Sequence, residues 1–355
     1  MACGKTHRFS FNPRTPVMRP SLIARAALGG ALACFAPPLY AQDAASALPS
    51  DELATWSFVW ENDYFADTDQ NYTNGIRISY LSGLKKPEGV SGFLAYDLLG
   101  AGKDAGIRRG FAIGHSIFTP EDTAASEPLP DQHPYAGWLY GEYSVVVQQR
   151  RRVHQVTLQA GVVGPAAQGE FLQNNWHDII DGDRVNGWDN QIRNEPGFVL
   201  SYDRQFRSVR DFGDGGFGAD ITPNVGVSVG NVDTRMRGGL TLRVGKDLRN
   251  DYGPVRVRPA LAGAGFFTPA NEFSWYLFLG AGGSAVAHNI FLDGSLFRDG
   301  DPSVGSRVLV GEVQAGLAMQ FRRVQIAYTF VGRTKEFDAQ DGAQEFGAIS
   351  ISTKF

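Results

Sequence analysis

The sequence predicts a twelve-stranded antiparallel transmembrane β-barrel of the bacterial outer-membrane type, with a short helix in one extracellular loop. Three observations predict this fold. The N-terminus carries an export signal, apolar residues alternate with small or polar ones in blocks of roughly ten residues, and an aromatic strand runs from Phe346 to the terminal Phe355. Glycine accounts for 43 of 355 residues and aromatic residues for 12 %, a composition unlike that of a helical bundle.

Charge and hydropathy exclude two other classes of protein. The 33 basic and 37 acidic residues give a net charge of -4, which is too balanced for a polyanion-binding surface, so we expect no nucleic-acid partner. No apolar run approaches the ~18 to 20 residues that a membrane-spanning helix needs. A soluble β-sandwich is the remaining alternative. The export signal, the glycines on the would-be interior parity and the C-terminal aromatic strand favour the barrel.

Residues 1–41 have the features of a secretory signal peptide. A block of basic residues without any acidic residue precedes an apolar stretch from Ala26 to Pro38, and small residues lead to a cleavage site after Ala41. A buried N-terminal helix is the alternative, but Pro37 and Pro38 would break it.

The exported chain, residues 42–355, is expected to form the barrel as a single domain. Both cysteines, Cys3 and Cys34, lie in the signal segment, and lipidation at Cys34 is a minor alternative. Removing five basic residues leaves 28 basic and 37 acidic ones, a net charge of -9. Because no cysteine remains, disulfides cannot stabilise this domain.

The strands follow from the period of two in hydropathy. Between Val313 and Phe321, for example, every second residue is apolar. Segment 256–266 also resembles a strand, but we leave it out because a single-chain bacterial barrel needs an even number. The predicted strands are 54–63, 73–83, 107–117, 137–149, 153–163, 197–207, 218–230, 236–246, 274–288, 308–321, 324–335 and 345–355.

The parity of the strands assigns every connection to one side of the membrane. The basic turns at 149–152 and 322–323 become periplasmic, where turns are short. In 168–181, Glu170, Gln173 and His177 are spaced by three and then four residues, which predicts a short helix with one polar face. The connections assigned to the extracellular side are 64–72, 118–136, 164–196, 231–235, 289–307 and 336–344.

Four polar clusters from distant parts of the chain are predicted to meet at the extracellular rim, which indicates a site. Turn chemistry explains an Asn-Asp pair at a strand end equally well, and the aromatic residues of these clusters could belong to an interfacial girdle. The clusters are 61–65, 69–75, 131–138 and 169–194.

The residues of these clusters suit ester hydrolysis. His177 is a candidate base, because the reference pKa of histidine lies near 6.5. The oxygen donors of Asn62, Asp63 and Asp183 suit Ca²⁺ better than a softer metal, and a divalent cation could polarise an ester carbonyl. The chain has no GxSxG motif, so the serine nucleophile of an α/β-hydrolase is unsupported.

Together these motifs resemble the lipid A 3'-O-deacylase family of Gram-negative outer membranes. The resemblance spans essentially all of residues 54–355, and the motifs keep the family's order and spacing. It rests on Glu61-Asn62-Asp63 with Phe65, Tyr72-Thr73-Asn74-Gly75, Pro134-Tyr135-Ala136-Gly137-Trp138, Gly161-Val162-Val163-Gly164-Pro165, Gly169-Glu170 with Gln173 and His177, and Trp188-Asp189-Asn190-Gln191.

The resemblance implies Ca²⁺-dependent hydrolysis of the 3'-linked acyloxyacyl chain of lipid A, at a site between the barrel wall and a helix in an extracellular loop. The mechanism implied is like that of secreted phospholipase A2. The family's Asn-Asp pair maps to Asn62 and Asp63, its threonine to Thr73 and its catalytic histidine to His177. Asp183 stands where a characterised member has a glutamate.

The charges of the second extracellular loop depart from the family pattern. A characterised site includes a lysine there, whereas this chain has no lysine between Lys103 and Lys246. We expect substrate contacts from His133, Tyr135, Asp183 and Arg184 instead, with Arg193 as a further cation.

Two alternatives stay open. An outer-membrane phospholipase would need a serine near a histidine, and Ser116 beside His115 is the adjacent pair in this sequence. In a passive pore or binding barrel, the polar clusters would merely cap strands. The expected partners are lipopolysaccharide and outer-membrane lipids, the expected location is the outer membrane with the site facing the extracellular leaflet, and a monomer is expected.

Overall fold

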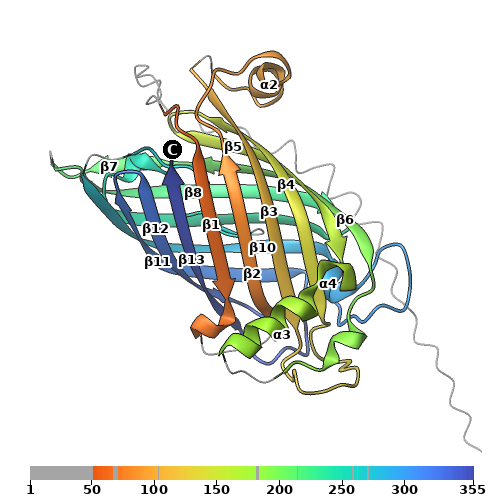
Figure 1. The fold of residues 1–355 in the computed structure, drawn as a ribbon. Helices are drawn as coiled ribbons and strands as arrows, with labels where there is room; N and C mark the ends of the chain where they lie inside the picture. Colours follow the sequence, from red (N-terminus) through yellow and green to blue (C-terminus); the bar gives the residue numbers. More distant parts are fainter. Residues whose placement is uncertain are drawn as a thin grey trace, which may run out of the picture. The chain divides into compact units, whose positions relative to one another are not determined.

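In a computed structural model of the chain, one closed antiparallel sheet forms the body of the protein (Figure 1). No helix among the described residues is long and apolar enough to cross a membrane. The predicted signal peptide, residues 1–41, lies outside the described residues. The structure describes residues 51–66, 71–102, 104–180, 184–213, 215–257, 260–261, 263–269 and 272–355.

The barrel is closed by pairing between β6 and β8, and all other neighbours in the sheet are neighbours in sequence or the first and last strands. Strand β7 continues β6 after an interruption at Arg207, since both pair with β8, so the wall has the predicted twelve strands. Their bounds are β1 Thr55–Asn62, β2 Asn71–Leu81, β3 Gly106–Thr119, β4 Ala136–Gln148, β5 Arg152–Val163, β6 Glu195–Phe206, β7 Ser208–Asp211, β8 Phe217–Gly230, β9 Asp233–Lys246, β10 Phe273–Asn289, β11 Leu309–Phe321, β12 Val324–Arg333 and β13 Gln344–Lys354.

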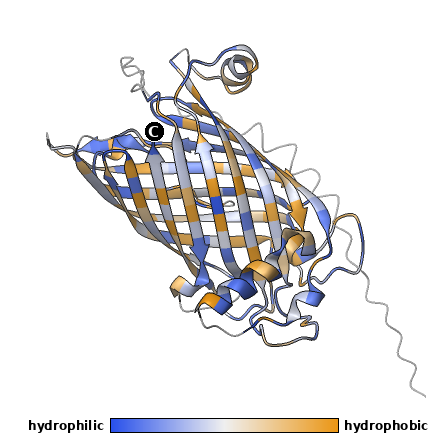
Figure 2. Cartoon of the chain, in the orientation of Figure 1, coloured by the Kyte–Doolittle hydropathy of each residue, from blue (hydrophilic) through white to orange (hydrophobic). Residues whose placement is uncertain are grey.

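Side chains alternate between the two faces of the wall, as the hydropathy pattern predicts. In β1, Trp56 and Phe58 are exposed on the outer face, whereas Ser57 points into the lumen and shares a 2.7 Å hydrogen bond with Ser352 of β13. Hydrophobic and hydrophilic segments alternate along the strands in the same way (Figure 2). The outer face is therefore the apolar one, as a lipid-facing wall requires.

The two ends of the barrel differ. We call the end where β1 stops and β2 begins the α3 rim, because helix α3 (Gly169–Ile180) lies across it (Figure 1). The opposite rim carries the two short turns predicted at 149–152 and 322–323. It also carries α2 (Gly89–Gly92) and the π-helix η2 (Phe93–Leu98), whose Ala95 packs against Val147 on the outer face.

The described residues of 251–269 lie in the lumen, and we call them the plug. From the opposite rim it runs inside the barrel, where Phe266 packs with Leu81 and Val146 on inward-facing strand positions. Earlier in the same segment, Arg256 donates a hydrogen bond of 3.1 Å to Glu61, near the end of β1 at the α3 rim. The described residues of 256–266 form no strand, as predicted. Their alternating pattern reflects packing against lumenal side chains rather than a place in the wall.

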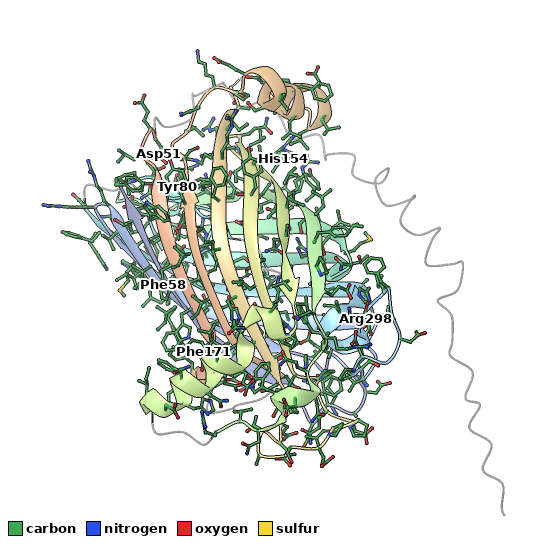
Figure 3. The ribbon with its side chains drawn as sticks, turned by 45° about the vertical axis from the view of Figure 1, so that its right-hand side comes forward. Asp51, Phe58, Tyr80, His154, Phe171 and Arg298 are labelled. Carbon is green, nitrogen blue, oxygen red and sulfur yellow. The ribbon has the colours of Figure 1, made fainter. Side chains whose placement is uncertain are left out.

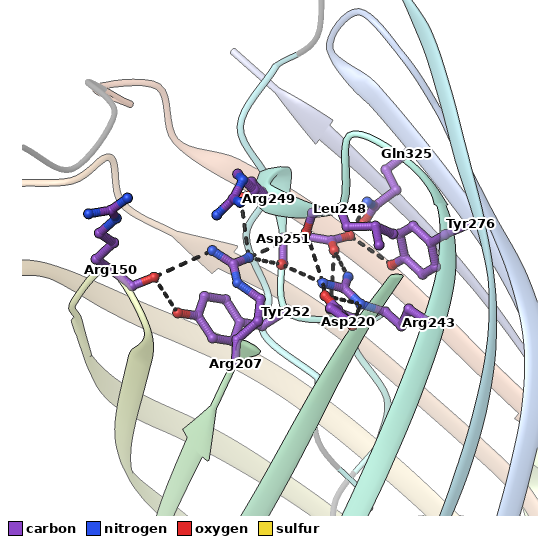
Figure 4. Close-up of polar contacts among 11 residues, drawn as sticks. Arg150, Arg207, Asp220, Arg243, Leu248, Arg249, Asp251, Tyr252, Tyr276 and Gln325 are labelled. Atoms are coloured by element: carbon purple, nitrogen blue, oxygen red, sulfur yellow. Dashed lines mark hydrogen bonds and ion pairs between the residues drawn. The ribbon is translucent and has the colours of Figure 1, made fainter. Parts of the chain in front are cut away.

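Asp251 anchors the first residues of the plug at the opposite rim (Figure 4). Its carboxylate accepts hydrogen bonds from Arg243, from Tyr276 Oη at 2.8 Å and from Gln325 Nε2 at 2.6 Å. Arg207 donates to the Asp251 carbonyl at 2.6 Å. Buried charges are tolerated only when paired and hydrogen-bonded in this way, so these contacts fix where the plug starts.

Candidate active site

A row of outward-facing residues crosses four strands near the α3 rim. Strand register pairs Asn62 of β1 with Asn74 of β2, Asn74 with Ile117 of β3, and Ile117 with Gly137 of β4. Directly opposed residues point to the same face of a sheet. The row therefore places two amide side chains, Asn62 and Asn74, on a face that is apolar along most of its height.

Asn62 shares its strand face with Trp56 and Phe58, yet it is only 4 % exposed where Trp56 is 46 % exposed. Its Oδ1 accepts a hydrogen bond from Tyr64 N at 2.8 Å, which fixes the first turn of η1 (Asp63–Ala66). Asp63, which begins η1, is 2 % exposed. The Asn-Asp pair is thus a rigid, buried source of oxygen ligands at the end of β1.

Thr73 lies at a β-bulge in β2. The register to β3 shifts between Tyr72 and Asn74, so Tyr72 reaches the lumen, where its hydroxyl donates to Glu61 at 3.0 Å. Thr73 shares a 2.7 Å hydrogen bond with Thr119, the last residue of β3. Bulges redirect side chains next to active sites. Here Thr73 is the extra residue of the bulge, and it directly precedes Asn74.

The predicted helix in 168–181 is confirmed as α3, Gly169–Ile180. It begins against β4, because Gly169 and Gly137 leave room for close packing: a Cβ atom on Gly169 would lie 2.6 Å from the ring of Trp188. Gln173 is buried on one face of the helix, and its Oε1 accepts a hydrogen bond from Trp188 Nε1 at 3.1 Å. Trp188 thereby holds the helix at a fixed rotation.

The far half of α3 reaches β1. The rings of Trp176 and Trp60 meet edge to face with centroids 5.5 Å apart, and Trp60 precedes Asn62 by two residues on the outer face. His177 follows Trp176 and lies four residues after Gln173, so it shares the buried helix face and is half-buried itself. The structure thus brings His177, Asn62, Asp63 and Thr73 to one rim, on the outer side of the wall.

Two of the expected substrate contacts, His133 and Tyr135, pack against other parts of the protein. His133 stacks on Phe118, with ring centroids 5.4 Å apart, and lines the lumenal cavity of about 70 Å³ together with Glu61. Burial lowers the pKa of His133 to about 4, so its ring is neutral. The expectation that His133 supplies a positive charge is therefore not supported.

Tyr135 belongs to the contact that seats the loop on the wall. The centroids of its ring and of the Trp188 ring are 5.1 Å apart, and both residues belong to one apolar cluster with Ile117 and Val185. The Tyr135 hydroxyl donates to the Thr123 carbonyl at 3.4 Å. The structure therefore gives Tyr135 a positioning role. Asp183 lies outside the described residues, and Arg184 is exposed beside α3.

The adjacent pair His115 and Ser116 does not form a nucleophile and base. His115 pairs with the outward-facing Ile76 and Leu139, and its Nε2 lies 2.7 Å from the Ala167 carbonyl. Ser116 points the other way and lines the lumenal cavity. Adjacent strand residues face opposite sides, so this requirement of the phospholipase alternative is not met.

Several site residues were not identified from the sequence as positioning residues. Trp60, Thr119 and His115 hold the loop and the bulge, and the signal that could have identified His115 and Thr119 is their polar character on the outward parity of β3. Gln173 Nε2 is buried without a hydrogen-bond partner among the described residues, beside the helix turn that carries His177.

The fold and the polar residues beneath α3 together define an outer-membrane-type barrel with a helix-covered polar cluster on the outer side of its wall. The comparisons with known proteins agree with this class. The family model described as "Outer membrane protein LpxR" matches residues 28–355. The chain therefore belongs to the LpxR family of outer membrane proteins, which confirms the family that the motifs indicated.

One solved structure shows the same fold. LpxR from Salmonella typhimurium superposes with a TM-score of 0.70 at 19 % identity, covering 85 % of this chain and 100 % of that one. The β domain of the Bordetella autotransporter BrkA gives a TM-score of 0.43 at 11 % identity, with 86 % and 100 % coverage. No curated protein sequence matches the chain.

Proposed function

We propose that this protein is a calcium-dependent lipid A 3'-O-deacylase, which hydrolyses the ester that links the 3' acyloxyacyl chain to lipid A. Membership of the LpxR family supports lipid A deacylation as the activity. The observation that carries the proposal is the buried polar end of β1, Asn62 and Asp63, on the lipid-facing side of the wall beneath the helix that bears His177. A membrane-embedded ester can approach this face, whereas it cannot enter the lumen.

His177 is the proposed base. It takes a proton from a water molecule as that water attacks the ester carbonyl, and it returns the proton to the 3' oxygen as the acyl chain leaves. The neutral imidazole accepts this proton, the imidazolium that forms donates it, and such a general acid and base contributes ~10² to 10⁴ in rate. The hydrogen bond between Gln173 and Trp188 holds the helix that carries this residue against the wall.

Asn62 and Asp63 fit a calcium site by the chemistry of their donors. Amide and carboxylate oxygens are ligands that Ca²⁺ prefers, and both side chains are buried at the end of β1. The described residues contain no group of three or more His, Cys, Asp or Glu that could hold a metal, so backbone oxygens, water or substrate would complete the shell. Bound calcium would supply positive charge to the developing oxyanion.

The proposed orientation places the α3 rim at the cell surface. The short turns at 149–151 and 322–323 then face the periplasm, as in outer-membrane barrels generally, and the site meets the outer leaflet, where lipid A lies. Asp183 and Thr73 are proposed to contribute to the same site. Thr73 would do so through its bulge next to Asn74.

The plug argues against a passive pore. Arg256 bridges Glu61 of β1 and Glu312 of β11, with both nitrogen-oxygen distances at 3.1 Å. The backbone N of the next residue, Val257, donates to Glu61 at 3.0 Å. These contacts cross the lumen with paired charges, beside a cavity of about 70 Å³ near the α3 rim.

Mass spectrometry of lipid A tests the function directly. We expect cells that express the chain to accumulate lipid A lacking its 3' acyloxyacyl chain, and chelation of calcium in isolated membranes to stop the conversion. Phospholipids from the same cells serve as the internal control and should stay unchanged. Fully acylated lipid A with hydrolysed phospholipids would overturn the proposal, and trimming that persists in chelator would remove calcium from it.

A further inference from the structure

A groove runs between α3 and the segment 184–191, apart from His177. It has a volume of about 280 Å³, large enough for a sugar ring with a substituent. Phe171 projects from α3 beside it and is 60 % exposed (Figure 3). The lining includes Gln168, Glu170, Phe171, Asn175, Arg184 and Gln191.

The groove lies on the side of α3 that is farther from the apolar belt. His115 holds the Ala167 carbonyl, just before α3 begins. Ile117 lies two residues closer than His115 to the end of β3. It packs with Val185 and Trp188, which belong to the segment across the groove. That segment is therefore closer to the rim than the helix is. A glycolipid bound with its acyl chains along the wall would have its saccharide on this side.

The lining has the chemistry of a carbohydrate site. Phe171 offers an exposed aromatic face, and Glu170 is an exposed acceptor. Gln191 donates through Nε2 to the Trp188 carbonyl at 2.9 Å, while its buried Oε1 has no hydrogen-bond partner among the described residues. A buried acceptor left without a donor is costly, so the Gln191 amide gains a hydrogen bond if it turns toward a sugar hydroxyl in the groove.

Arg184 gives the groove its cation. It is exposed and is the one basic residue among those that line the groove, in a region of sequence where no lysine occurs between Lys103 and Lys246. A guanidinium binds phosphate or carboxylate in bidentate geometry. The expected ligand is therefore a saccharide with an anionic group, not a neutral sugar.

We infer that this groove binds the anionic saccharide part of the glycolipid substrate, with Phe171 packing against a sugar ring and Arg184 pairing with its phosphate or carboxylate. The inference rests on the proposed function for the identity of the glycolipid. It assigns the saccharide to a surface separate from the reacting atoms, so the groove changes binding of the substrate rather than its chemistry.

The test compares three substrates in detergent micelles: deep-rough lipopolysaccharide with its acidic core sugars, phosphorylated lipid A without core sugars, and dephosphorylated lipid A. Arg184→Ala and Phe171→Ala are the groove variants. Ile179→Ala is the matched control, since Ile179 is on the same helix, is 76 % exposed and does not line the groove.

We expect each groove variant to raise KM about tenfold for the anionic substrate that the wild type prefers, with kcat unchanged, as for loss of one charge-assisted contact or one aromatic contact. Dephosphorylated lipid A should be least affected by Arg184→Ala. If the wild type prefers deep-rough lipopolysaccharide to lipid A without core sugars, Arg184 is assigned to a carboxylate of the core. If the preference depends instead on the phosphates of lipid A, Arg184 is assigned to phosphate.

Binding measured in a His177→Ala background separates the two proposals. If the wild type deacylates nothing, the proposed function fails, while fluorescence titration with deep-rough lipopolysaccharide still reports on the groove. The inference is overturned if Arg184→Ala and Phe171→Ala match Ile179→Ala both in KM and in this titration.

Discussion

The lumen and the outer face of the α3 rim both contain buried polar side chains, but they use them differently. In the lumen, Arg256 is paired with Glu61 and Glu312, and Glu312 also pairs with Arg333 at 2.9 Å. On the outer face, Asn62, Asn74 and His115 interrupt a surface that is apolar along most of its height. Polarity in a lumen is expected in any such barrel, whereas polarity on the lipid-facing side needs a functional reason.

The largest effect should come from the outer face. His177→Ala should lower kcat for lipid A deacylation by ~10² to 10⁴, because it removes the base without disturbing the wall. The readout is the initial rate of 3' chain release in detergent micelles, with the thermal stability of the barrel measured in parallel. Unchanged stability together with unchanged kcat would exclude His177 as the base.

The lumen should show the reverse pattern. Arg256→Ala removes the cation that the buried carboxylates of Glu61 and Glu312 share, and breaking a buried ion pair costs ~3 to 5 kcal/mol. Urea unfolding in micelles should show this loss, while kcat per folded molecule stays near that of the wild type. Arg256→Lys is the control that keeps the charge. A loss of kcat in a stable Arg256→Ala protein would mean that lumen and site are not separate.

The barrel could be predicted because its signal is local and repeated. Alternation over about ten residues marks each strand without reference to any partner, and every predicted strand matches an observed one within three residues at each end. Segment 256–266 shows the limit of this signal. Its alternation is real, but only parity could exclude it from the wall, and no pattern indicated that its described residues lie in the lumen.

The site was predictable only as far as local motifs reach. The motifs at Asn62, Asp63 and His177 led to the proposed chemistry, and their placement at one rim followed from strand parity. The positions of His133 and Tyr135 did not follow from strand parity, because a loop residue has no alternating pattern and its neighbours come from far along the chain. The contact between Trp60 and Trp176 joins residues more than a hundred positions apart, which no local pattern encodes.

The calcium proposal sharpens the comparison on the outer face. Asn62→Ala should reduce the rate by ~10² to 10³, as the loss of a group that supports oxyanion stabilisation commonly does. If Asn62 holds calcium, excess Ca²⁺ should restore part of this loss and should restore none of the loss in His177→Ala. Rates measured across a calcium titration test the point. An Asn62→Ala enzyme insensitive to calcium would place the metal elsewhere.

The smallest effect concerns pH and belongs to the lumenal side of the rim. Burial holds the pKa of His133 at about 4 in the folded protein, against a reference of about 6.5 when unfolded. Between these values the unfolded chain binds a proton that the folded protein does not, so stability falls as pH drops from about 6.5 to about 4. The loss should approach about 3 kcal/mol.

His133→Asn isolates this contribution, because its amide can replace the contact between His133 Nδ1 and the Pro134 carbonyl, 2.7 Å long in the structure, and does not titrate in this range. The difference in unfolding free energy between pH 8 and pH 4.5 should be smaller in the variant than in the wild type by about 2 to 3 kcal/mol. Constant effects of the substitution, such as lost stacking on Phe118, cancel in this comparison. Equal pH dependence in both proteins would show that His133 is accessible to protons in the folded state, and the lumenal side of the rim would then be as open to water as the face beneath α3.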